Sequence, residues 1–266
     1  MSVRIAVLGA VLLLACGCAS LRPLGSGWTV ELGLDSLLAL PAARFERLGD
    51  LQAEARITVR DGKVHQRATA LIQVRNPDLL RLEVRGGPLL SHVFTALQRG
   101  DSLYVHAPQA GGSLKGEVRG PLLFALTGVD LGGYDLRYAL FGIVEPGAVD
   151  STQLLPPARR GVAVVPVTGT RRRQVWVDLR RGLVTGEDLL QADGRPLLQR
   201  RLCEYRRTGG VLLPQRVEIH QGGRVLVVEY RSLAVDRGLA ARTLLRGLPL
   251  DRMQPVDLPA DPAVQD

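Results

Sequence analysis

Residues 51–60 read LQAEARITVR, and in this stretch apolar and polar side chains alternate strictly. A period of two sends successive side chains to opposite faces of a β-strand, so this segment predicts a strand with one buried and one wet face. The apolar set is Leu51, Ala53, Ala55, Ile57 and Val59, and the polar set is Gln52, Glu54, Arg56, Thr58 and Arg60. Asp61-Gly62 follows at once and favours a tight hairpin turn.

The same rhythm continues through most of the chain. It predicts further strands at 64–75, 80–85, 93–98, 103–107, 161–167, 174–180, 183–191, 196–206, 212–220 and 224–235. Short connections make neighbours antiparallel, and an antiparallel sheet of about eleven strands must curl or close. The fold class is therefore mainly β with a few helices (α+β), built on one curved antiparallel sheet.

Helical spacing occurs in three places, once before the first strand and twice between strands. Residues 34–48 predict an amphipathic helix that starts or kinks at Pro41, and 118–127 and 134–141 predict two short helices after the fifth strand. We expect residues 145–160 to form a loop and the chain to fray from about Asp251.

The N-terminus predicts export. Arg4 precedes an apolar run at 5–15, about 11 residues, which suits a signal-peptide core and is too short to span a bilayer. Leu13-Leu14-Ala15-Cys16 resembles a lipobox, which implies acylation of Cys16, with Cys18 as the alternative; an ordinary cleaved signal is the other interpretation. Asp does not follow either cysteine, which for a lipoprotein of a two-membrane cell implies the outer membrane. We therefore divide the chain into a lipoprotein signal peptide and acylation site (1–18), a tether (19–33), a folded domain (34–240) and a C-terminal tail (241–266).

Composition argues for a globular protein that does not bind nucleic acid. The chain of 266 residues is 46% hydrophobic, 23% charged and 4% aromatic, with a net charge of +8 carried almost wholly by arginine. The arginines alternate with apolar residues instead of clustering with stacking aromatics, which indicates solvated strand faces and at most a weak attraction to anionic headgroups. Cys203 is the one cysteine outside the N-terminus; we expect it in the core, with a bond to Cys16 or Cys18 as a remote alternative.

No pattern in the chain predicts catalysis, a metal site or a cofactor. His65, His92, His106 and His220 form no His-Glu-x-x-His motif, and no Gly-x-Ser-x-Gly elbow exists. Ser91 and His92 are neighbours on a predicted strand and would face opposite ways, which opposes a nucleophile–base pair. The glycine-rich run at 111–115 lacks the spacing of a phosphate loop and is expected to be a solvent loop.

Three segments resemble the LolA/LolB superfamily of lipoprotein carriers and receptors. They are DLLRLEV (78–84) followed by GPLLS (87–91), LTGVDL (126–131) followed by DLRYALFG (135–142), and the strand–turn–strand rhythm of 177–219. The resemblance covers about residues 34–236. Leu90 stands where the receptor branch has glycine, and the C-terminal half is longer and richer in arginine than a minimal receptor.

The resemblance implies an incomplete β-barrel whose open side is covered by helices around an apolar cavity for acyl chains. Leu89, with Leu90, falls on the protruding loop that enters membranes, although the next strand could also start early and bury one of the two. The cavity and lid positions would be Leu122, Leu123, Leu126, Leu136, Leu140 and Phe141. The implied partners are acylated lipoproteins, a periplasmic lipoprotein carrier and membrane lipid, at the periplasmic side of the outer membrane. A relative that binds another lipid, or an envelope scaffold, is the alternative.

Overall fold

The computed structural model describes residues 34–86, 91–110, 112–118, 129, 136–144, 151–155, 160–166, 172–178 and 180–255, all within one compact unit, Leu32–Asp266. The helices are α2 (Leu34–Glu46), α4 (Leu136–Phe141) and α5 (Ala241–Leu245), with 3-10 turns η1 (Pro108–Ala110) and η2 (Leu250–Arg252). In the first half the strands are β1 (Asp50–Asp61), β2 (Val64–Arg75), β3 (Leu79–Gly86), β4 (Ser91–Arg99), β5 (Ser102–Ala107) and β6 (Gly112–Glu117). In the second half they are β7 (Ser151–Leu155), β8 (Arg160–Pro166), β9 (Arg172–Asp178), β10 (Leu183–Leu190), β11 (Pro196–Cys203), β12 (Arg206–Thr208), β13 (Val211–Leu213), β14 (Arg216–Gln221), β15 (Arg224–Val235) and β16 (Gln254–Pro255).

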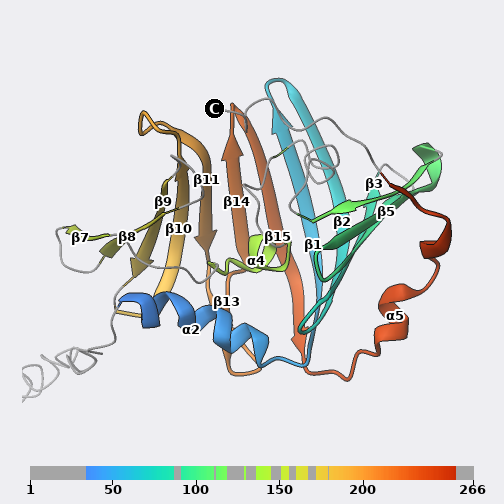
Figure 1. Ribbon diagram of the computed structural model, residues 1–266, viewed down its shortest axis with the longest axis horizontal. Coiled ribbons are helices and arrows are strands. Elements are labelled where there is room, and N and C mark those ends of the chain that lie inside the picture. Colours follow the sequence, from blue (N-terminus) through green and yellow to red (C-terminus); the bar gives the residue numbers. More distant parts are fainter. Residues whose placement is uncertain are drawn as a thin grey trace, which may run out of the picture. The chain divides into compact units, whose positions relative to one another are not determined.

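The predicted curved antiparallel sheet is confirmed. Among the described residues it has 14 strands in the order β16-β6-β5-β4-β3-β2-β1-β15-β14-β11-β10-β9-β8-β7, and the two end strands do not pair with each other (Figure 1). β1, the strand with the strict alternation, lies near its middle between β2 and β15. The sheet is therefore an open half-barrel, and its long central strands come from both halves of the chain.

One face of the sheet carries the hydrophobic core. The inward side chains of β1, Leu51, Ala53 and Ala55, are fully buried, whereas Ile57 and Val59 further along are only partly buried. α2 adds Leu38, Ala42 and Phe45 to this core, and they cover the end of the sheet where β1 begins. The core therefore fills one end of the concave face more completely than the other.

The N-terminal helix differs from expectation at Pro41. The helix runs from Leu34 to Glu46 with Pro41 in its interior, seven residues after its first residue, so it does not start there. Proline removes one helical N–H, yet packing of Leu38, Ala42 and Phe45 on the sheet holds the helix together across that position.

Three short strands lie where the sequence predicted loop or tail. β6 takes up most of the glycine-rich run, β7 lies within the predicted loop 145–160, and β16 pairs in parallel with β6 instead of fraying. The predicted strands 196–206 and 212–220 also each split, because β12 and β13 form a separate two-stranded sheet. Strands of this length carry too few alternating residues for a period of two to show in the sequence.

The segment after β15 turns back across the convex face. The Asp50 carboxylate accepts hydrogen bonds from the backbone N–H groups of Arg237, Gly238 and Leu239 at 2.8–2.9 Å, which fixes this reversal to the start of β1. α5 then packs Leu244 against Leu79 and Leu97. None of the helices in the described part of the chain has the length and hydropathy that a transmembrane span requires.

Candidate functional site

An apolar cavity of about 550 Å³ lies on the concave face, at the end that the core leaves partly open. Its lining residues come from six strands, η1 and α4: Ile57, Val59, Gln66, Arg67, Ala68, Leu82, Val84, Gly86, Val93, Phe94, Gln109, Leu136, Leu140, Ile219, Leu226 and Val228. Ligand pockets in proteins commonly have volumes of about 300–1,000 Å³, so the cavity has room for a small molecule or part of a lipid chain.

The strand register explains why these side chains converge. Ile57 lies opposite Ala68 on one side and Val228 on the other, and Val59 lies opposite Gln66 and Leu226. Directly opposed residues point to the same face of a sheet, so alternation along each strand becomes a continuous apolar surface across strands. Of the lining residues Arg67 alone carries a charge, and the other polar side chains are Gln66 and Gln109.

The helix α4 forms the wall opposite the sheet. Leu136 and Leu140, one helical turn apart, both line the cavity and are 2% and 5% exposed. A helix of 6 residues is too short to be stable by its own hydrogen bonds, so its position depends on what holds it to the sheet.

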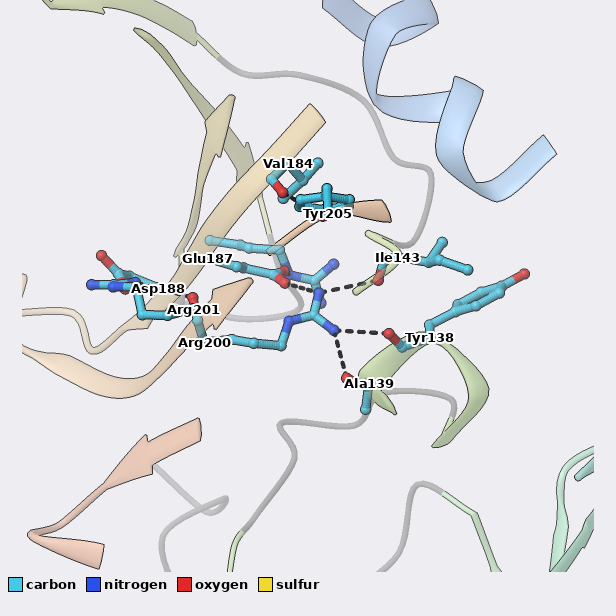
Figure 2. A network of polar contacts seen from close by, with 10 residues as sticks. Tyr138, Ala139, Ile143, Val184, Glu187, Asp188, Arg200, Arg201 and Tyr205 are labelled. Atoms are coloured by element: carbon cyan, nitrogen blue, oxygen red, sulfur yellow. Dashed lines mark hydrogen bonds and ion pairs between the residues drawn. The ribbon is translucent and has the colours of Figure 1, made fainter. Parts of the chain in front are cut away.

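A buried arginine on β11 holds the end of α4. Arg200 donates from Nη1 to the carbonyl oxygens of Tyr138 at 2.9 Å and Ala139 at 3.3 Å, and from Nη2 to that of Ile143 at 3.1 Å (Figure 2). The last carbonyls of a helix have no partner within it, and a guanidinium with its fixed fork of donors can satisfy several at once.

The charge of Arg200 is balanced inside the protein. Its Nη2 pairs with Glu187 on β10, whose other carboxylate oxygen lies 2.9 Å from Nε of Arg173 on β9. Arg200 is 1% exposed and Glu187 is fully buried, so the sheet and α4 are joined through a desolvated ion network. This corrects the expectation that strand arginines face solvent, since Arg173 and Arg200 do not.

Aromatic packing fixes α4 from the side of β15. Phe141 lies between Phe45 and Tyr230, with ring centroids 5.5 Å from each, and Tyr230 donates its hydroxyl to the carbonyl of Leu140 at 2.5 Å. Burial raises the pKa of Tyr230, so this hydroxyl keeps its proton and remains a donor. Phe141, the last residue of α4, therefore fixes the helix through these aromatic contacts and is not among the residues that line the cavity.

Several predicted site residues lie outside the described residues: the acylation candidates Cys16 and Cys18, the loop residues Leu89 and Leu90, and the lid residues Leu122, Leu123 and Leu126. For the loop, the described strand ends on either side, Gly86 and Ser91, pair with each other at the cavity end of the sheet. Cys203 was expected in the core, but it is a free, half-buried residue at the end of β11, and burial raises its pKa.

Three of the histidines contact separate polar side chains. His92 contacts the Thr95 hydroxyl and His106 the Ser113 hydroxyl, both at 2.8 Å, and His220 lies 3.3 Å from Glu218. No group of three or more His, Cys, Asp or Glu side chains that could hold a metal occurs within the described part of the chain.

Comparison with known proteins places the fold. No protein-family model matches the sequence, and neither does any curated protein. Among solved structures, a LolA superfamily protein from Nitrosomonas europaea superposes with a TM-score of 0.60 at 13% identity, over 80% of this chain and 97% of that one. A domain from Vibrio parahaemolyticus named for outer membrane lipoprotein sorting gives 0.59 at 12% identity, over 79% and 95%. A DUF1329 family protein from Desulfovibrio piger gives 0.59 at 13% identity, over 78% and 94%. The chain therefore has the fold of LolA superfamily proteins, as its sequence motifs predict.

Proposed function

We propose that this protein is a lipid-anchored receptor of the outer membrane, which binds the acyl chains of lipoproteins in its cavity and helps insert them into that membrane. The observation that carries the proposal is the apolar cavity of about 550 Å³ between the concave sheet and α4. Binding, not catalysis, is the task that such a lining suits, because aliphatic and aromatic side chains provide no nucleophile or general base.

The physical need for such a cavity is clear. Burying one methylene group contributes about 0.8 kcal/mol, so an acylated protein leaves a membrane for water only at great cost. A half-barrel whose cavity is lined mostly by apolar side chains offers an alternative environment of similar quality. A receptor must also release its cargo to the membrane.

Membrane attachment of the receptor itself rests on the N-terminal sequence. We propose that Cys16, or else Cys18, is acylated and tethers the domain to the periplasmic face of the outer membrane. The partners on this proposal are acylated lipoproteins, a periplasmic lipoprotein carrier and membrane lipid.

Titration with a fluorescent fatty-acid probe tests the binding site. The protein is the full chain with Cys16→Ser and Cys18→Ser, so that no acyl group of its own competes. Ala68→Phe places a ring in the cavity and should weaken probe binding about tenfold or more, which corresponds to roughly 1.4 kcal/mol. Thr69→Phe, the next residue on the opposite face of β2, is the matched control and should bind as the parent does. Equal affinity of all three proteins would mean that the probe binds elsewhere.

A second candidate is a relative that carries a phospholipid. The polar side chains Gln66, Arg67 and Gln109 among the lining residues would suit a polar headgroup next to the acyl chains. Mass spectrometry of whatever co-purifies from membranes in mild detergent separates the two: an acylated lipoprotein supports the receptor, and phospholipid alone supports the relative.

A further inference from the structure

Two chain reversals and the adjoining ends of β3 and β4 lie at the cavity end of the sheet. β1 and β2 are joined by the Gly62–Lys63 turn, and Asp61 pairs with Arg224 next to the turn between β14 and β15. The end of β3, Gly86, pairs with Ala68 of β2 and with Ser91, the first residue of β4, so these strand ends lie at the same end of the sheet. Because Val59, Gln66, Gly86 and Leu226 line the cavity, its apolar surface begins within a few residues of these reversals.

The end of the β1–β2 hairpin, residues 60–67, is strongly cationic; we call it the hairpin tip. Arg60, Lys63 and Arg67 are all exposed there, together with His65. The single acid, Asp61, accepts a hydrogen bond from Nε of Arg224 at 3.0 Å, so its charge is already balanced. Within the described residues no carboxylate pairs with Arg60, Lys63 or Arg67, which leaves about three positive charges facing solvent.

An apolar side chain lies among these charges. Val64 is 55% exposed, the most exposed large hydrophobic residue in the described chain, and Lys63 and His65 flank it. Val93, at the start of β4 and 39% exposed, is at the same end of the sheet. The β1–β2 hairpin also reaches beyond its neighbours in Figure 1, at the top of the view.

We infer that the hairpin tip docks the protein on an anionic lipid surface, with the cavity end of the sheet facing the membrane. Cationic side chains next to an exposed apolar residue are typical of protein segments that lie at a membrane interface, where the cations contact phosphate groups and the apolar group enters the headgroup layer. The role of this docking rests on the proposed function: it shortens the path of an acyl chain between cavity and bilayer.

A lipid surface fits the tip better than a protein partner does. The cations lie on a projecting turn and two strand ends, and Arg60 and Lys63 are not among the residues of the cavity. A fluid layer of phosphates can adapt to flexible side chains spread in this way, whereas protein interfaces depend on a central, well-packed cluster.

Vesicle sedimentation tests the inference. The protein is the full chain with Cys16→Ser and Cys18→Ser, mixed with vesicles of phosphatidylglycerol and phosphatidylcholine or of phosphatidylcholine alone. The tip variant carries Arg60→Gln and Lys63→Gln. The control carries Arg47→Gln and Arg99→Gln, two exposed arginines at the opposite end of the sheet, and so has the same net charge.

The tip variant should bind the anionic vesicles more weakly by about 25-fold, since each cation near such a surface contributes about fivefold. The control should bind as the parent does, and vesicles of phosphatidylcholine alone should not distinguish the three proteins. Equal losses in tip and control variants, or no loss in either, would overturn the inference, because net charge or another surface would then govern binding. Normal vesicle binding by a tip variant that no longer accepts a lipoprotein from its carrier would also overturn it in favour of a protein-docking tip.

The fatty-acid titration keeps this inference separate from the proposed function. The tip variant should bind the probe normally, since neither of its substitutions lies in the cavity. If the parent binds vesicles through the tip but binds no acyl probe, the proposed function fails and the docking surface stands.

Discussion

Nη1 of Arg200 on β11 lies 2.9 Å from the carbonyl oxygen of Tyr138 in α4, so a buried guanidinium of the sheet holds the helix that forms one wall of the cavity. The two residues are 62 positions apart in the chain. The cavity therefore depends on a polar contact in the interior as well as on its apolar lining.

Replacing Arg200 with methionine should be strongly destabilising. The change leaves the Glu187 carboxylate buried with one partner fewer and removes the guanidinium donors from the carbonyl groups at the end of α4. Loss of one partner of a buried ion pair costs about 3–5 kcal/mol. Urea unfolding measures this loss in the free energy of unfolding. Arg201→Met is the control, because Arg201 is 37% exposed where it pairs with Asp188 and should cost about 1 kcal/mol or less. Similar losses of stability in the two variants would show that the buried ion network stabilises the fold no more than the partly exposed ion pair does.

Gly142, which ends α4, should tolerate no side chain. Its φ is +73°, and a Cβ there would lie 2.8 Å and 2.9 Å from the two Cδ atoms of Leu202. Gly142→Ala combines backbone strain of about 1–2 kcal/mol with that collision. Gly100→Ala is the matched control, since its φ is +56° and nothing lies within 4 Å of the added Cβ. The variant at 142 should lose more thermal stability and bind the fatty-acid probe more weakly; equal melting temperatures would contradict the collision.

Glu83 on the convex face should make stability depend on acid pH. Burial alone would raise the pKa of Glu83, but hydrogen bonds and charges from Arg85 and Arg81 outweigh it and lower the pKa below 4.5. A carboxyl with a depressed pKa contributes stability above its unfolded pKa, and the contribution is lost as the pH falls through the folded pKa. Glu83→Gln should therefore lower the free energy of unfolding at pH 7 by about 1–2 kcal/mol and by much less near pH 3. Glu117→Gln, at an exposed position on β6, serves as control; a constant difference between pH 7 and pH 3 would refute the assignment.

Alternation in the sequence predicts the sheet well where strands are long and have one wet face, as in β1, β2 and β3. The alternation did not lead us to the buried charges, although the positions of the two arginines in their strands indicated them. Arg200 shares its strand face with Leu198 and Leu202, and Arg173 shares its face with Val175 and Val177, so both occupy positions where the pattern calls for apolar residues. The arginine-rich composition suggested that all strand arginines were solvated. Only the position of each arginine in the alternation could have distinguished Arg173 and Arg200 from the arginines that face solvent.

The network also needs partners that lie far away in the sequence. Glu187 comes from β10 and the carbonyl groups from the end of α4, and no local pattern brings these together with Arg200. The same limit applies to the cavity. Its individual apolar residues are predictable, but its position at one end of the concave face follows from how far α2 and its side chains fill the other end.

Leu89 follows the strand end at Gly86, where the cavity lining stops. If the leucine enters the bilayer during delivery, Leu89→Glu should leave the melting temperature and probe binding unchanged, while transfer of an acylated lipoprotein into liposomes should fail. If the leucine is instead buried in the fold, the same change should cost several kcal/mol, because it places an unpaired charge in an apolar environment. Leu114→Glu is a suitable control, since Leu114 is a 37% exposed leucine on β6 and is not part of the cavity lining. A well-folded Leu89→Glu protein that delivers lipoprotein normally would remove this residue from the mechanism, and a large loss of thermal stability would assign it to the core.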